Sequence, residues 1–150
     1  MYIVASTGHT GEYTVPARQL REWTIIPAAG HRVARVRSVL FGPTDAPAGA
    51  TTGTQIIVVQ NGVEGQPSLR LPVAQATFSF DKVASITGSR PNPDSVDLSL
   101  TYPNDEGAFA DAVRAVEFSD THPLILRYSN NTDADYVGTI VCQVLYTVMD

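Results

Sequence analysis

The C-terminal run of the chain alternates between apolar and more polar side chains, and this pattern constrains the fold more than any other feature. Between Tyr136 and Met149, one face is apolar throughout: Ile140, Cys142, Val144, Tyr146 and Val148. A period of two residues is that of a β-strand. The opposite face mixes threonine and glutamine with Val141 and Leu145. The run therefore predicts one long strand whose second face, being partly apolar, is also expected to have a covering partner.

Shorter strand patterns recur along the rest of the chain. Residues 95–102 (SVDLSLTY) alternate cleanly between apolar and polar side chains. Further strands are expected at Tyr2–Ala5, Leu20–Ile26, Val33–Phe41, Gln55–Gln60, Ser68–Val73, Ala76–Phe80 and Leu124–Tyr128. The alternation changes phase between residues 73 and 76, which predicts a bulge or a break there, and Pro72 disfavours a central position in a sheet. Segments rich in glycine and proline at 42–53, 61–67 and 87–95 predict turns.

One segment has helical rather than strand periodicity. Phe109, Ala112, Val113 and Val116 recur at a spacing near 3.6 residues, and Asn104 or Asp105 can cap the start. We therefore expect one short helix near residues 105–117. The predicted fold is a single all-β domain over residues 1–150, a β-sandwich of about eight or nine strands, for which the jelly roll is one possible arrangement.

Charge and cysteine content exclude several classes of protein. The net charge of −5 argues against a protein that binds nucleic acid by neutralising phosphates. The charge is uneven: residues 1–50 carry a net +2, from five arginines against three carboxylates, and the remainder carries −7. Cys142, the single cysteine, excludes an intramolecular disulfide and a multi-cysteine zinc site. No apolar run is long enough to span a membrane, and the N-terminal sequence lacks the pattern of a signal peptide, so we expect synthesis in the cytoplasm.

Residues with catalytic or metal-binding chemistry are scattered. The three histidines, His9, His31 and His122, are far apart, and none has a second histidine nearby. The run Ser119-Asp120-Thr121-His122 contains the residue types of a catalytic triad, but four consecutive residues before a proline favour a turn in which Asp120 bonds to its own backbone. Paired carboxylates such as those of glycosidases could be drawn from Glu106, Asp111, Glu117 and Asp120, as in any acidic protein. We expect no enzymatic activity and no cofactor.

The segment from Asn130 to Asp135 is the best candidate for a metal site. Its alternating oxygen-bearing side chains suit Ca²⁺, but it lacks the central glycine and the distant glutamate of an EF-hand loop. Asn and Asp are also typical of tight turns. A plain hairpin loop is the prediction, with calcium binding as the alternative, and no metal dependence is expected.

The arginine-rich segment at residues 31–41 is the best candidate for an interaction site. In a regular strand, Ala34, Val36, Ser38 and Leu40 would face the core, and His31, Val33, Arg35, Arg37, Val39 and Phe41 would share the outer face. Arginine beside apolar residues is the mixture enriched at protein interfaces. We therefore predict an interface at Arg35, Arg37 and Phe41. The alternative is a solvated face whose arginines lie over neighbouring strands.

In overall character the chain resembles small β-sandwich structural proteins of virus particles, particularly the decoration or accessory proteins of tailed-phage heads. The resemblance rests on Thr- and Val-rich strands, long Gly/Pro/Ala loops and the final strand YVGTIVCQVLYTVMD. It implies a non-enzymatic virion component that forms homo-oligomers, with a trimer favoured, and that docks on a major capsid or other virion protein without nucleic acid or membrane. The alternative is a carbohydrate- or receptor-binding module with Trp23 or tyrosines as stacking platforms, and an enzyme is a third class.

Overall fold

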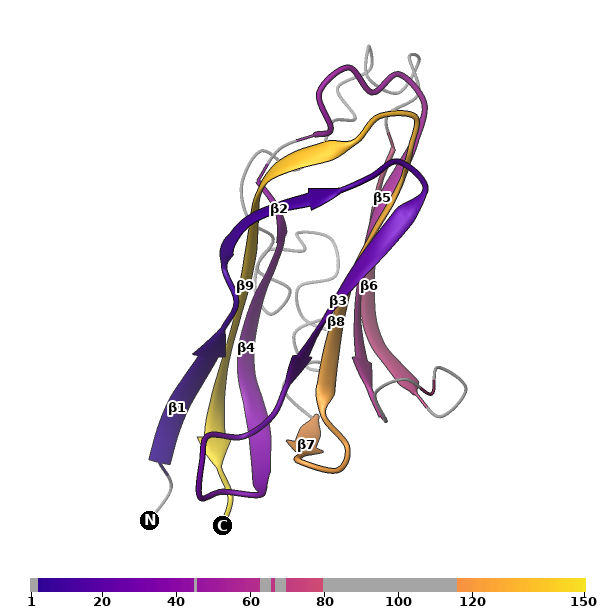
Figure 1. Cartoon of the computed structure of the whole chain (residues 1–150). Coiled ribbons are helices and arrows are strands. Elements are labelled where there is room, and N and C mark those ends of the chain that lie inside the picture. Colours follow the sequence, from indigo (N-terminus) through magenta and orange to yellow (C-terminus); the bar gives the residue numbers. More distant parts are fainter. Residues whose placement is uncertain (1–2, 45, 63–65, 67–69, 80–115) are drawn as a thin grey trace.

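In the computed structural model, the described residues are 3–44, 46–62, 66, 70–79 and 116–150. They form antiparallel β-strands and connecting loops (Figure 1). The strands are β1 (Ile3–Gly8), β2 (Gly11–Val15), β3 (Gln19–Ile25), β4 (Val33–Pro43), β5 (Gly53–Asn61), β6 (Leu71–Ser79), β7 (Glu117–Ser119), β8 (Leu124–Thr132) and β9 (Tyr136–Val148). No helix among these residues is long and apolar enough to cross a membrane.

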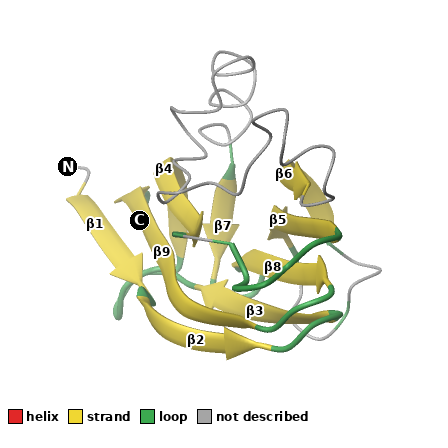
Figure 2. Ribbon diagram, turned by 90° about the horizontal axis from the view of Figure 1, so that it is seen from above, coloured by secondary structure: helices red, strands yellow, loops and turns green. Residues whose placement is uncertain are grey.

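The strands form two curled sheets that face one another (Figures 1 and 2). Sheet A has the order β1-β9-β4-β7, and β2 continues the edge of β9 beyond β1. Sheet B has the order β3-β8-β5-β6. Strands from opposite ends of the chain are neighbours in both sheets: β1 and β2 pair with β9, and β3 pairs with β8. Strands from the N-terminal part of the chain therefore pair directly with strands from its C-terminal part in both sheets.

The core lies between the sheets and is built from alternate residues of each strand, as the period of two requires. Aromatic rings fill much of it in edge-to-face contact. The ring centroids of Trp23 and Phe41 are 5.6 Å apart, and those of Phe118 and Tyr146 are 5.3 Å apart. Such pairs favour one arrangement of the core because the ring edges and faces carry opposite partial charges.

The long C-terminal strand is confirmed. In β9, Ile140, Cys142, Val144, Tyr146 and Val148 are all buried, as the alternation predicts. On the other face, where a covering partner was expected, no second sheet is found among the described residues, and the exposed side chains include Leu145. β9 lies at the centre of sheet A, between β1 and β2 on one side and β4 on the other.

The remaining strand predictions are confirmed in part. The segments at 68–73 and 76–80 were expected as separate or bulged strands, and the structure has one strand, β6, with a register shift beside Pro72. β6 is at the edge of sheet B in the described part of the chain. β2 and β7 were not expected. The strand at 95–102 and nearly all of the helix at 105–117 lie outside the described residues, but residue Glu117 of that helix begins β7.

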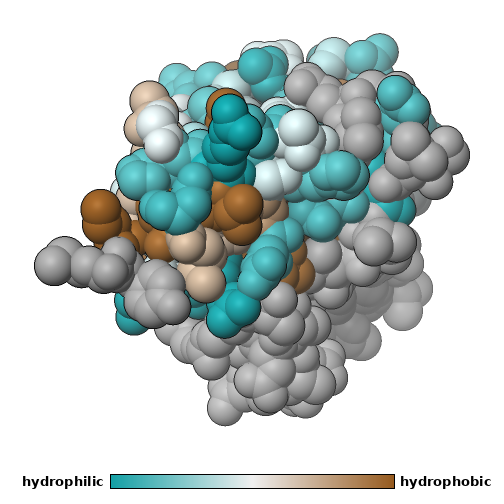
Figure 3. All heavy atoms as spheres, turned by 90° about the horizontal axis from the view of Figure 1, so that it is seen from below, coloured by the Kyte–Doolittle hydropathy of each residue, from teal (hydrophilic) through white to brown (hydrophobic). Residues whose placement is uncertain are grey.

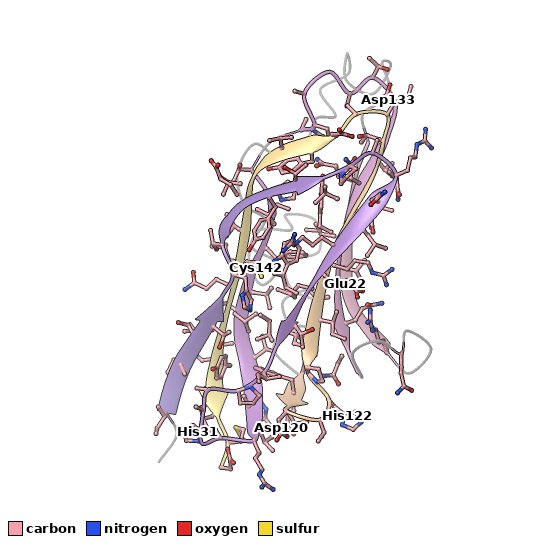
Figure 4. The ribbon with its side chains drawn as sticks, in the orientation of Figure 1. Glu22, His31, Asp120, His122, Asp133 and Cys142 are labelled. Carbon is pink, nitrogen blue, oxygen red and sulfur yellow. The ribbon has the colours of Figure 1, made fainter. Side chains whose placement is uncertain are left out.

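Cys142 is buried between the sheets (Figure 4), and burial raises the pKa of its thiol to about 12. A thiol that stays protonated and inaccessible does not react. We predict that a thiol reagent at pH 8 labels the native protein at less than about one hundredth of the rate for the urea-unfolded chain. Mass spectrometry at timed intervals measures both rates. Fast stoichiometric labelling of the folded protein would contradict the placement of this side chain.

Candidate interface on sheet A

β4 places the two arginines on the outer face of sheet A through a bulge. Val36 is opposite Tyr146 on β9 and Ser38 is opposite Leu145, so Arg37 is an extra residue with no counterpart. A bulge of this kind bends the strand and redirects a side chain. Arg35 and Arg37 are both exposed, as the sequence predicts. Their role at an interface remains a prediction.

The bulge makes the prediction for Phe41 wrong. A regular strand would put Phe41 on the same face as the arginines, but the extra residue reverses the alternation after position 37. Phe41 is 0% exposed and contacts Trp23 in the core, and Val39 is buried with it. Ser38 and Leu40, which were expected in the core, are partly exposed instead. Phe41 is therefore a core residue and offers nothing to a partner.

The two arginines differ in their partners. A nitrogen of the Arg35 guanidinium donates to the Glu117 carboxylate on β7 at 2.6 Å, in a pair that is about half exposed. Arg37 forms no ion pair or hydrogen bond through its guanidinium within the part of the chain that the structure describes. It lies beside Ser38 and Leu145 at an open hollow of about 410 Å³. Because Arg35 is paired with Glu117, Arg37 is the arginine of β4 whose charge can bind a partner.

The outer face of sheet A carries no charge along its central strand, β9. Its side chains on β1, β9 and β4 are Val4, Ser6, Val137, Thr139, Val141, Gln143, Leu145, Thr147, Arg35, Arg37, Ser38 and Leu40. Val137 is 73% exposed and Leu145 is 37% exposed. At the lower end of the sandwich, Ile3 and Ile26 are also about half exposed. Figure 3, which views the molecule from below, shows apolar residues at the surface there. Apolar residues with arginine and without lysine are typical of the centre of an interface.

Glu12 contributes to the same face, and no sequence pattern had pointed to it. β2 pairs Glu12 with Thr139 and Thr14 with Val137, so Glu12 points outward beside the upper part of β9. Its carboxylate has no ion-pair partner among the described residues. The missed signal was the alternation of residues 11–15, which is too short to be recognised without the pairing to β9.

The candidate catalytic residues that the structure describes do not converge, and Glu106 and Asp111 lie outside the described residues. His31 and His122 lie on separate loops at the lower end of the sandwich (Figure 4). The Ser119–His122 segment is the predicted turn, but Ser119 closes it: its hydroxyl accepts from the His122 backbone N–H at 2.9 Å. The Asp120 carboxylate, which was expected to close the turn, accepts no hydrogen bond within the described part of the chain, and the Asp120 backbone N–H donates to the Arg32 carbonyl at 3.3 Å. Among the described residues, no three His, Cys, Asp or Glu side chains are grouped as metal ligands.

The hairpin prediction for Asn130–Asp135 is wrong, because β8 and β9 do not pair: Asn130–Thr132 end β8 in sheet B, and residues 133–135 cross to β9 in sheet A. The polar side chains of the segment bind protein groups. The Asn130 side chain is buried, donates to the carbonyls of Val15 and Ala134, and accepts from Thr132. Asp133, at the upper end in Figure 4, accepts from the Thr51 hydroxyl at 2.6 Å and its backbone N–H at 2.9 Å. These hydrogen bonds lower the pKa of the Asp133 carboxyl to about 2.

The stacking platform proposed for a carbohydrate is not available at Trp23, which is 6% exposed. Its ring is covered by Tyr13, at 5.1 Å between centroids, and by Phe41. Of the tyrosines that the structure describes, Tyr128, Tyr136 and Tyr146 are buried and only Tyr13 reaches the surface, under the guanidinium of Arg21 at 4.5 Å.

No protein-family model matches the chain, and no curated protein matches it.

Proposed function

We propose that this protein is a structural subunit of a virus particle, a decoration or accessory protein that forms homo-oligomers and stabilises a larger shell by added contact area. Three copies is the expected number. The protein acts by contacts alone: a subunit that bridges neighbouring shell proteins opposes their separation. The partners are other copies of this chain and a major capsid or other virion protein.

The strand order supports the inference that the sandwich is a jelly roll. In that fold a long two-stranded ribbon, with the ends of the chain side by side, rolls into two facing sheets. The pairing of β1 and β2 with β9, and of β3 with β8, agrees with such a ribbon. The separation of consecutive strands β3, β4 and β5 into alternate sheets agrees with it as well. Jelly rolls are common in viral capsid proteins and also occur in lectins and cupins.

The observation that carries the proposal is the outer face of sheet A. A sheet face that only meets water usually carries many charged side chains. Here the outward residues of the central strand β9 are all uncharged, and Val137 and Leu145 are exposed. A single-chain protein gains nothing from such a face, whereas a subunit of an assembly can cover it.

The proposal is tested on particles. We expect the protein to be a stoichiometric component of virus particles purified by density gradient from a culture that produces them, detected by mass spectrometry and by immunogold labelling on the particle surface. Loss of the gene should leave particles that release their contents at a lower temperature. The proposal fails if the protein remains at the top of the gradient while other structural proteins sediment with the particles.

A further inference from the structure

We propose that the outer face of sheet A binds the same face of a second copy of this chain, related by a two-fold axis, with Arg37 of each copy near Glu12 of the other. The inference rests on the proposed assembly function and names the occupant of that surface. It follows from three properties of the face: two charges that have no ion-pair partner in the described part of the chain, their separation, and the exposed apolar residues between and beside them.

The two charges have opposite signs and lie at opposite ends of the face. Arg37 is next to Leu145, toward the lower end of β9, and Glu12 is opposite Thr139, toward the upper end. At about 3.4 Å per residue, the six residues between positions 139 and 145 separate them by roughly 20 Å. Neither has an ion-pair partner among the described residues, whereas Arg35 is neutralised by Glu117 on its own chain.

This arrangement makes the face complementary to itself. β2 and β4 flank β9 on opposite sides, so when two copies pack face to face with their β9 strands crossing obliquely in roughly opposite directions, the positive end of each lies over the negative end of the other. A two-fold contact repeats each pair, so one charge pair per copy gives two in the complex. With parallel strands, like charges would be opposed.

The apolar side chains follow the same symmetry. Val137 is near the Glu12 end and Leu145 is near the Arg37 end, with Val141 halfway between them. Opposite strand directions therefore bring each exposed Val137 toward the Leu145 end of the other copy and place Val141 near the axis. Burial of these side chains removes apolar surface from water in both copies at once.

Because the face is small, its charges determine whether two copies bind. A surface roughly 27 Å long on three strands, each about 4.8 Å apart, is smaller than that of a standard stable interface, which buries about 800 Å² on each partner. A contact of this size is weak. The repulsion between opposed like charges exceeds the free energy that burial of the apolar side chains contributes. Reversal of one charge should therefore be enough to separate the copies.

The experiment is a charge exchange, read out as mass by sedimentation equilibrium at an ionic strength of about 0.01 M, where screening is weak. We expect an even number of 16.1 kDa chains in the wild-type complex: two for this contact alone, or six where it joins two trimers. Arg37→Glu should halve that mass and raise the dissociation constant at least about tenfold. Glu12→Arg should do the same, and the double variant should restore the wild-type mass.

Arg32→Glu is the matched control, because it makes the same change in net charge from the exposed loop before β4 and should leave the mass unchanged. Circular dichroism verifies folding, and if one single variant loses its β spectrum the other tests the same repulsion from the opposite end. A monomeric or purely trimeric wild type overturns the inference, as does a double variant that folds but stays dissociated. A trimer would leave the proposed function intact, whereas an even-numbered complex absent from particles would overturn that function alone.

Discussion

Replacement of Gly53 by alanine is expected to destabilise the protein by about 4 kcal/mol, the larger of the two effects on stability that we predict. A Cβ at this position would lie 2.1 Å from the Asn131 carbonyl oxygen and 2.7 Å from the Thr132 Cα, both of which are backbone atoms that cannot rotate away. The φ of +99° adds strain for any residue with a side chain. Since Gly53 begins β5 opposite Thr132, the clash would separate β5 from β8 at the upper end.

Gly49→Ala and Gly30→Ala isolate the contribution of the backbone angle. Their φ values are +80° and +89°, but a Cβ at either position would meet nothing within 4 Å. Each should therefore cost only about 1 kcal/mol, the strain of a left-handed residue. Urea unfolding followed by circular dichroism measures all three free energies. Equal losses for the three variants would show that the contact at Gly53 relaxes and that strain alone matters.

Glu22→Gln is expected to cost about 2–3 kcal/mol, because it removes the negative charge from a carboxylate that binds a buried guanidinium through two hydrogen bonds. The Arg70 side chain is 2% exposed and binds both carboxylate oxygens of Glu22, one through Nη1 and the other through Nη2 at 3.2 Å. Gln60 also accepts from Arg70, at 3.3 Å, and keeps part of the network when the charge is removed. The Nε of Arg127 is 3.5 Å from the same Glu22 carboxylate, so Glu22 forms ion pairs with both Arg70 and Arg127.

Glu117→Gln provides the matched comparison on the other sheet. It removes the same charge from a pair with Arg35 in which both side chains are about half exposed, and such pairs contribute about 0–1 kcal/mol. Thermal unfolding at low and high salt should show a large, nearly salt-independent loss for Glu22→Gln and a small, salt-dependent one for Glu117→Gln. Losses of similar size would mean that water reaches the Arg70 guanidinium.

The predictions that succeeded concern strands in which the alternation of buried and exposed residues continues without interruption. In β9 every second residue faces the core, so the burial of Cys142 and Tyr146 could be predicted from alternation alone. The irregularity in β6 could be predicted because the alternation changes phase along residues 73–76, and its place at the edge of the described sheet because Pro72 cannot donate to a neighbouring strand. These are local properties, and no partner strand is needed to recognise them.

The predictions that failed concern places where a partner decides the geometry. Residues 33–41 are equally compatible with an outward or an inward Phe41, because both faces of β4 carry apolar side chains. The pairing of Val36 with Tyr146 and of Ser38 with Leu145 makes Arg37 the extra residue and sends Phe41 to the core. The turn at Ser119 is similar: a hydroxyl and a carboxylate were both able to close it, and the path of the backbone selected Ser119.

The sequence by itself determined that the chain forms strands, which face of β9 is buried and that arginines lie outward on β4, because a period of two residues and the cost of burying an unpaired charge act within one segment. Only the tertiary structure decided which charges stay unpaired. Arg35 is neutralised by Glu117 from a strand far along the chain, and Arg37 is left exposed by the bulge. Glu12 shares its sheet face because β2 pairs with β9, and such long-range pairing depends on how all the strands pack together.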